Sequence, residues 1–160
     1  MERRETPTTS EAFRSTVPYA QERIHAAAVY CSDGRLGEAF DDFLDHGLRL
    51  PRYDRVAVPG GAACLAGHFS AFREGEAAMD QLRFLVDAHE LARVVLIAHQ
   101  KCAFYTHRLR VHEIDLRNRQ LEDLARAASR ARRLCPSLAV EGYFAAVTDR
   151  DTVVFERIDV

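Results

Sequence analysis

The chain alternates between short apolar runs and longer segments in which apolar residues recur at three- and four-residue steps. Three of the apolar runs lack a helical period and are typical of parallel strands that are buried on both faces. They span residues 24–30, 56–58 and 94–98. The segments with helical spacing span residues 36–48, 77–89 and 114–135. This alternation predicts an α/β fold with a mostly parallel β-sheet flanked by helices.

The two ends of the chain depart from this alternation. Residues 138–144 and 152–158 enclose a polar turn, which predicts a C-terminal antiparallel hairpin. Residues 1–18 are polar and contain two prolines, so we expect an N-terminal arm or a short helix there. The remaining residues, 19–160, are expected to form a single α/β domain.

The third expected helix carries apolar and basic residues at positions that predict its faces. Its spacing predicts that Ile114, Leu124 and Cys135 face the core, whereas Arg130 faces solvent. Pro136 is expected to end this helix, because proline cannot continue the backbone hydrogen-bond pattern.

Composition excludes several classes of protein. A chain of 160 residues with 48% hydrophobic and 29% charged residues is typical of one water-soluble globular domain. A formal net charge of −2 gives no basic excess for a phosphate backbone, so we expect no nucleic-acid partner. The longest apolar stretch, residues 26–31, is far too short to span a bilayer, and the first ten residues lack an apolar signal region. We therefore expect a cytoplasmic protein with no membrane partner.

Residues with metal-binding chemistry follow two of the three predicted strands. Cys31 follows the first strand, and His99 and Cys102 follow the third. In open α/β sheets, ligands bind beyond the carboxyl ends of the strands. Zinc favours thiolate and imidazole donors, and three protein ligands leave the fourth position for water. The cluster therefore predicts a Zn²⁺ site, with Cys31, His99 and Cys102 as candidate ligands.

Residues 31–35 (CSDGR) and 99–102 (HQKC) resemble the CxDxR and HxxC signatures of the β-class carbonic anhydrases. The resemblance covers about residues 24–144 and identifies the chain as similar to a short, divergent member of that family. It implies a zinc-binding α/β domain, a homodimer or higher homo-oligomer, and carbon dioxide or bicarbonate as the small-molecule substrate. The implied activity is that of a carbonate dehydratase, a lyase that hydrates carbon dioxide reversibly to bicarbonate through a zinc-bound hydroxide.

The resemblance also implies a role for each motif residue. Cys31, His99 and Cys102 would bind zinc, and Asp33 and Arg35 would form a catalytic Asp–Arg pair. In the family, the Asp either pairs with the Arg, which is the active arrangement, or binds zinc as a fourth ligand. Independently of the family, Asp33 is suitably spaced to orient a zinc-bound hydroxide, and Arg35 would keep that carboxylate ionised.

Two departures from the family pattern leave the substrate open. Residues 58–61 (VPGG) replace a segment that is commonly similar to Arg-Asn-Ala-Gly, and Ala103 replaces the usual Gly after HxxC. A zinc hydrolase of another small heterocumulene, carbonyl sulfide or carbon disulfide, is one alternative. A non-catalytic, zinc-binding carbonic-anhydrase-like protein is another. A thiol redox protein using Cys31 and Cys102 is disfavoured, because the chain has no CxxC motif.

The remaining cysteines and histidines have simpler interpretations. Cys64 and His68 have the i, i+4 spacing of a helical metal pair, but their apolar surroundings favour packing in the core. His107 and Tyr105 follow the HxxC motif closely, and each is a candidate proton carrier near the mouth of the site.

Overall fold

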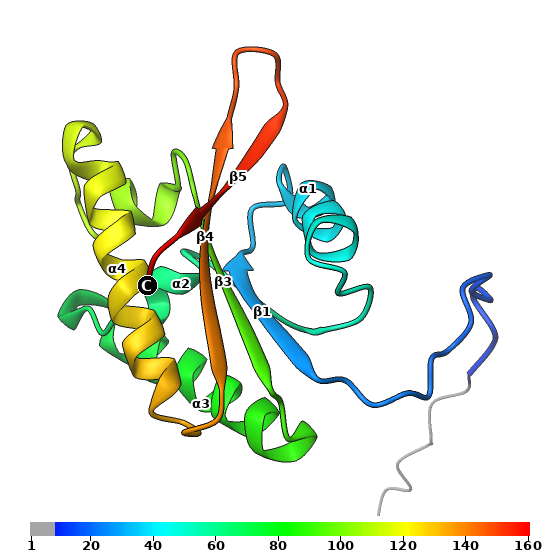
Figure 1. Ribbon diagram of the computed structural model, residues 1–160. Coiled ribbons are helices and arrows are strands. Elements are labelled where there is room, and N and C mark those ends of the chain that lie inside the picture. Colours follow the sequence, from blue (N-terminus) through cyan, green and yellow to red (C-terminus); the bar gives the residue numbers. More distant parts are fainter. Residues whose placement is uncertain (1–8) are drawn as a thin grey trace, which may run out of the picture.

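A computed structural model of the protein describes residues 9–160 and is built around a five-stranded β-sheet (Figure 1). The strands are β1 (Ala26–Cys31), β2 (Asp54–Val58), β3 (Arg93–His99), β4 (Ala139–Val147) and β5 (Val153–Ile158). Their order across the sheet is β2-β1-β3-β4-β5. The first four strands are parallel, and β5 runs antiparallel to β4. The mostly parallel sheet and the C-terminal hairpin expected from the sequence are confirmed.

Helices cover both faces of this sheet (Figure 1). One face is covered by α2 (Ala62–Leu65), α3 (Phe72–His89) and α4 (Leu116–Arg132). The other is covered by α1 (Gly37–Asp42) and the π-helical turn η1 (Phe43–Gly47). Three further helical turns are η2 (Phe69–Ala71), η3 (Phe104–Arg108) and η4 (Glu113–Asp115). Among the described helices, none has both the length and the apolar character needed to cross a membrane.

The central strands are buried on both faces, and their alternate side chains belong to two separate cores. Ala27 and Val29 of β1 pack beneath α2, α3 and α4, whereas Ala28 and Tyr30 pack beneath α1. Successive side chains of a strand point to opposite faces, so one apolar run supplies both cores. Full burial of a Val or Leu side chain contributes about 1.5–3 kcal/mol. Burial on both sides explains why the sequences of β1 and β3 are unbroken apolar runs.

The third expected helix, α4, is shorter than its sequence pattern, and two predictions about its faces are wrong. Ile114 lies before the helix in η4 with 90% of its surface exposed. Cys135 lies beyond the helix but packs, partly buried, against the core as expected. Arg130 faces the protein: its guanidinium donates to the Leu65 carbonyl at 2.9 Å and pairs with Glu76 at 2.6 Å. An arginine can bury its aliphatic stem while its charge stays paired, which spacing alone does not reveal.

The N-terminal segment extends away from the sheet (Figure 1). In the described part of this segment, residues 9–18 form neither a helix nor a strand. The rest of the expected arm or helix, residues 1–8, lies outside the described residues. The division into an arm, residues 1–18, and a single domain, residues 19–160, stays a prediction.

The turn after β2 depends on two consecutive glycines. Gly60 and Gly61 both have positive φ angles, of 84° and 52°. A Cβ atom at Gly61 would lie 2.6 Å from the backbone nitrogen of Cys31, and one at Gly60 would lie 2.6 Å from the Phe104 ring. The VPGG segment therefore allows this turn to pack directly against the end of β1, next to a predicted metal ligand.

We expect Gly61→Ala to destabilise the fold, because alanine there would combine a positive φ with backbone overlap. The conformational strain alone costs about 1–3 kcal/mol. The matched control is Gly37→Ala at the start of α1, where a Cβ atom meets nothing within 4 Å and alanine favours the helix. Chemical denaturation measures both variants, and equal free energies of unfolding would contradict the prediction.

Candidate metal centre

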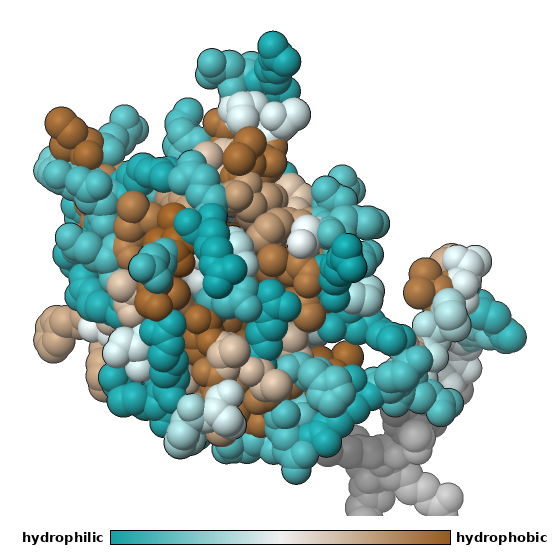
Figure 2. Space-filling model, in the orientation of Figure 1, coloured by the Kyte–Doolittle hydropathy of each residue, from teal (hydrophilic) through white to brown (hydrophobic). Residues whose placement is uncertain are grey.

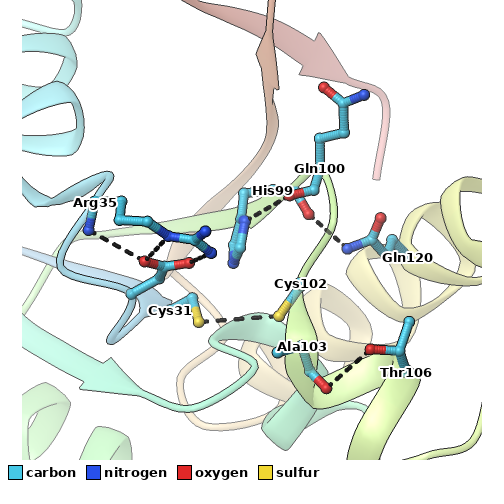
Figure 3. Close-up of polar contacts among 9 residues, drawn as sticks. Cys31, Arg35, His99, Gln100, Cys102, Ala103, Thr106 and Gln120 are labelled. Atoms are coloured by element: carbon cyan, nitrogen blue, oxygen red, sulfur yellow. Dashed lines mark hydrogen bonds and ion pairs between the residues drawn. The ribbon is translucent and has the colours of Figure 1, made fainter.

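The sheet topology brings the predicted metal ligands together at the carboxyl ends of two strands (Figure 3). Cys31 is the last residue of β1, His99 is the last residue of β3, and Cys102 follows in the next turn. Because β1 and β3 are neighbouring parallel strands, their carboxyl ends lie side by side. One potential ligand atom from each of the three residues lies within 4.8 Å of the other two, and all three residues are buried.

The spacing of the two sulfurs suits a tetrahedral zinc ion. The Sγ atoms of Cys31 and Cys102 are 3.9 Å apart. Zinc–sulfur bonds of about 2.3 Å at a tetrahedral angle separate two sulfurs by about 3.8 Å. A Cys₂His set also leaves one coordination position for water or substrate. The donor atoms and their spacing therefore fit zinc in a catalytic type of site.

The imidazole of His99 presents an unpaired nitrogen to the two sulfurs (Figure 3). Its Nδ1 lies 2.9 Å from the Gln100 carbonyl oxygen, which only accepts hydrogen bonds. In the neutral ring, Nδ1 therefore carries the proton and Nε2 the lone pair. Nε2 is buried and has no hydrogen-bond partner among the described residues. An imidazole whose tautomer is fixed in this way is ready to bind a metal.

The thiols of Cys31 and Cys102 are in contact, and this contact shifts their pKa values in opposite directions. The hydrogen bond with Cys102 holds the pKa of Cys31 well below its usual range. The same contact, together with burial, raises the pKa of Cys102. Cys31 is therefore the readily formed thiolate, and Cys102 must release a proton when a cation binds.

Asp33 and Arg35 form a bidentate ion pair, and Figure 3 shows Arg35 beside the ligand cluster. Arg35 donates from Nε to Oδ1 of Asp33 at 2.9 Å and from Nη2 to Oδ2 at 2.6 Å. Its backbone N–H also donates to Oδ1, at 3.1 Å. The side-chain hydrogen bonds of Arg35 lower the pKa of Asp33 to about 2. Asp33 is therefore ionised at neutral pH.

A cavity of about 590 Å³ adjoins the ligand cluster. Its lining includes Asp33, Arg35 and His99, together with residues between 147 and 153 at the tip of the β4–β5 hairpin. A water molecule takes about 30 Å³ in the liquid, so the cavity has ample room for a small molecule beside solvent. The ion pair and one predicted ligand thus border the same space.

Cys64 and His68 do not form a second metal pair. Cys64 is buried on α2, where its thiol donates to the Pro59 carbonyl at 2.9 Å and burial raises its pKa to about 11. His68 lies beyond the end of α2, and its Nε2 lies 2.7 Å from Oδ2 of the buried Asp123. The prediction that both side chains pack in the core is confirmed, although His68 does so as half of a polar pair.

Tyr105 and His107, the two candidate proton carriers, do not lie at the mouth of the site, where they were expected. Tyr105 is almost completely buried, and burial followed by the charge of Asp123 raises the pKa of its hydroxyl. His107 is exposed and does not line the cavity beside the ligand cluster. Neither residue lies at the mouth of that cavity.

Sequence reasoning missed two buried polar residues on α4. Gln120 donates from Nε2 to the His99 carbonyl at 2.7 Å, and Asp123 lies against Tyr105. Both positions interrupt the inward apolar face of the helix, next to Leu124. Polar residues at inward-facing positions of the helix were the sequence signal that could have identified Gln120 and Asp123.

The sequence matches the family model "Putative carbonic anhydrase" over residues 21–155. The chain belongs to this carbonic anhydrase family. The matched range contains both motifs, residues 31–35 and 99–102. No curated protein matches the sequence.

A solved carbonic anhydrase has a similar fold. The carbonic anhydrase from Glaciozyma antarctica aligns with a TM-score of 0.54 and 18% sequence identity, over 82% of this chain and 80% of that chain. At 18% sequence identity, this structural similarity shows a shared fold and nothing more. The resemblance that the CxDxR and HxxC motifs carried is thus confirmed as membership of a carbonic anhydrase family.

We expect Co²⁺ to bind the purified protein with an absorption band from thiolate-to-cobalt charge transfer. Cys31→Ser and Cys102→Ser should each remove most of that band, because each deletes one of the two sulfur donors. Cys64→Ser is the matched control, since Cys64 is a buried cysteine whose thiol donates to Pro59. Absorption titration measures the bands, and a full band in the Cys31→Ser and Cys102→Ser variants would contradict the assignment.

Proposed function

We propose that this protein is a β-class carbonic anhydrase, a zinc-dependent lyase that hydrates carbon dioxide reversibly to bicarbonate. The observation that carries the proposal is the convergence of two cysteine sulfurs and one unpaired imidazole nitrogen beside the Asp33–Arg35 ion pair. Membership of a carbonic anhydrase family supports the same activity.

In this proposal, Cys31, His99 and Cys102 hold the zinc ion. Zinc bound there would act as a Lewis acid that lowers the pKa of a water molecule to about 7 and so supplies a nucleophile for carbon dioxide. The protein contributes the fixed tautomer of His99, since the Gln100 carbonyl holds the Nδ1 proton. It also contributes burial, which keeps bulk water away from the three donor atoms.

Asp33 would orient the proton of a hydroxyl that enters the cavity. Its carboxylate stays ionised because Arg35 binds it on both oxygens. Among the described residues, Oδ2 accepts one hydrogen bond, so a lone pair remains for another donor. Arg35 would also restrain Asp33 from joining the metal ligands, which corresponds to the active arrangement that the resemblance implies.

Other chemistries share part of this arrangement. A zinc hydrolase of carbonyl sulfide or carbon disulfide would use the same donor set, and a non-catalytic protein would bind zinc without turnover. A redox protein would use Cys31 and Cys102 as a dithiol. The buried, unpaired Nε2 of His99 favours a metal over the dithiol, because a dithiol leaves that nitrogen without a partner.

We expect the zinc-loaded protein to hydrate carbon dioxide in a stopped-flow assay, and Asp33→Ala to lower the rate by about 10–100-fold. Asp87→Ala is the matched control, because it removes an exposed carboxylate on α3, away from the cluster. Carbonyl sulfide and carbon disulfide are assayed in parallel. Turnover of either sulfur substrate without hydration of carbon dioxide would favour that alternative, and bound zinc without any turnover would favour a non-catalytic protein.

We also propose that the protein works in the cytoplasm as a homodimer or higher homo-oligomer. Large apolar side chains remain exposed on the described surface, including Phe69 at 97%. Figure 2 shows hydrophobic surface over β4 and β5, where Val147 and Val154 are about half exposed. Contiguous exposed apolar surface is typical of an interface.

Sedimentation equilibrium tests this association. We expect at least twice the monomer mass at micromolar concentration, because association removes the exposed apolar side chains from water. Val154→Asp should weaken the assembly, because it places a charge on the exposed apolar surface of β5, whereas Asp87→Asn should not. A monomer at every concentration would contradict the proposal.

A further inference from the structure

Helix α4 buries two polar side chains in an otherwise apolar face. Gln120 and Asp123 are 1% and 0% exposed, and Leu124 and Ala127 beside them are fully buried. Burial of an amide or a carboxylate is costly unless hydrogen bonds and opposite charges compensate it. The partners of these two residues therefore indicate what they do.

Gln120 holds the beginning of the loop that carries two predicted metal ligands. Its Nε2 donates to the backbone carbonyl of His99 at 2.7 Å (Figure 3). His99 is the last residue of β3, and its own ring is fixed by the next carbonyl, that of Gln100. The amide of Gln120 thus fixes the backbone from which the imidazole projects.

Asp123 holds the end of the same loop through Tyr105. The Tyr105 ring packs in one buried cluster with Cys31 and Cys102, and its hydroxyl faces the Asp123 carboxylate. The backbone N–H of Tyr105 donates to the Cys102 carbonyl at 3.1 Å and also interacts with the Cys102 thiol. Tyr105 therefore connects Asp123 to the second cysteine ligand.

The Asp123 carboxylate is itself held in place by cationic and donor groups. His68 lies 2.7 Å from Oδ2. Nη2 of Arg126 lies 3.0 Å from Oδ1, and Nε of Arg119 lies 3.8 Å from it. These cationic groups compensate the buried charge. His68 holds Oδ2, whereas Oδ1 has ion-pair contacts with Arg126 and Arg119 but no hydrogen bond among the described residues.

We propose that Gln120 and Asp123 are positioning residues for the metal centre, which hold the two ends of the loop formed by residues 99–105. The inference rests on the proposed function, since it concerns the same three ligands. The two residues are three positions apart on one helix, so a single rigid element sets the positions of both His99 and Cys102. Within the loop, Lys101 has a φ of 56°, which residues other than glycine rarely adopt, so the loop needs support from outside.

Two mild substitutions test the proposal. Gln120→Met removes the amide at nearly constant length, and Tyr105→Phe removes only the hydroxyl that faces Asp123. We expect each to weaken zinc binding by about 10–100-fold, as is typical when a partner of a metal ligand is lost. Competition with a chromophoric chelator measures zinc affinity, and the thiolate-to-cobalt absorption band reports the geometry of the ligands.

Leu124→Ala is the matched control, because it opens a cavity on the same helix face without touching the loop. We expect it to lower the thermal midpoint of the metal-free protein while zinc affinity stays within about twofold, because binding depends on the folded fraction, which remains near one. If Leu124→Ala weakened zinc binding as much as Gln120→Met and Tyr105→Phe do, the effect would come from general destabilisation of the helix, and the proposal would be overturned.

The remaining outcomes separate this proposal from the proposed function. Wild-type zinc affinity and an unchanged cobalt spectrum in both Gln120→Met and Tyr105→Phe would overturn the positioning role alone. Failure of the wild-type protein to bind zinc or cobalt would overturn the metal centre and, with it, the positioning role.

Discussion

The candidate site depends on one buried imidazole nitrogen that no described residue satisfies. Nε2 of His99 lies against two sulfurs, and the Gln100 carbonyl prevents the ring from turning its proton toward them. A protein interior tolerates few such atoms, because each unsatisfied acceptor costs about 1–3 kcal/mol. A cation would satisfy the nitrogen and both sulfurs together, so the three donors as a group favour a metal more strongly than any one of them does.

The fold supplies this arrangement through the direction of its strands. Parallel neighbours such as β1 and β3 end at the same edge of the sheet, so residues far apart in the sequence meet there. The glycine turn after β2 allows a third segment to pack against the same edge, and α4 closes it from one side. The site is therefore a product of sheet topology and helix packing together.

Much of the fold, and the three residues that meet in the candidate metal cluster, could be predicted from the sequence, because apolar runs and motif spacing mark them. Unbroken apolar runs identified the buried strands, and Cys31 and His99 were recognisable at their ends. The contacts of Gln120 with His99 and of Asp123 with His68 could not be predicted, since each joins segments that no short-range spacing relates. The exposure of Ile114 also escaped prediction, because it lies in a turn just before the helix begins.

The Asp33–Arg35 pair differs from the metal ligands in its contact with solvent. Arg35 is 81% exposed, whereas the three ligand residues are buried. Dissolved ions weaken the attraction between exposed charges, and their Debye length shortens from about 8 Å at physiological ionic strength to about 3 Å at 1 M salt, whereas buried groups are screened much less. The Asp33–Arg35 ion pair therefore weakens as the salt concentration rises, while the buried sulfur and nitrogen donors keep their arrangement. One half of the site thus responds to the surrounding medium, and the other half is insulated from it.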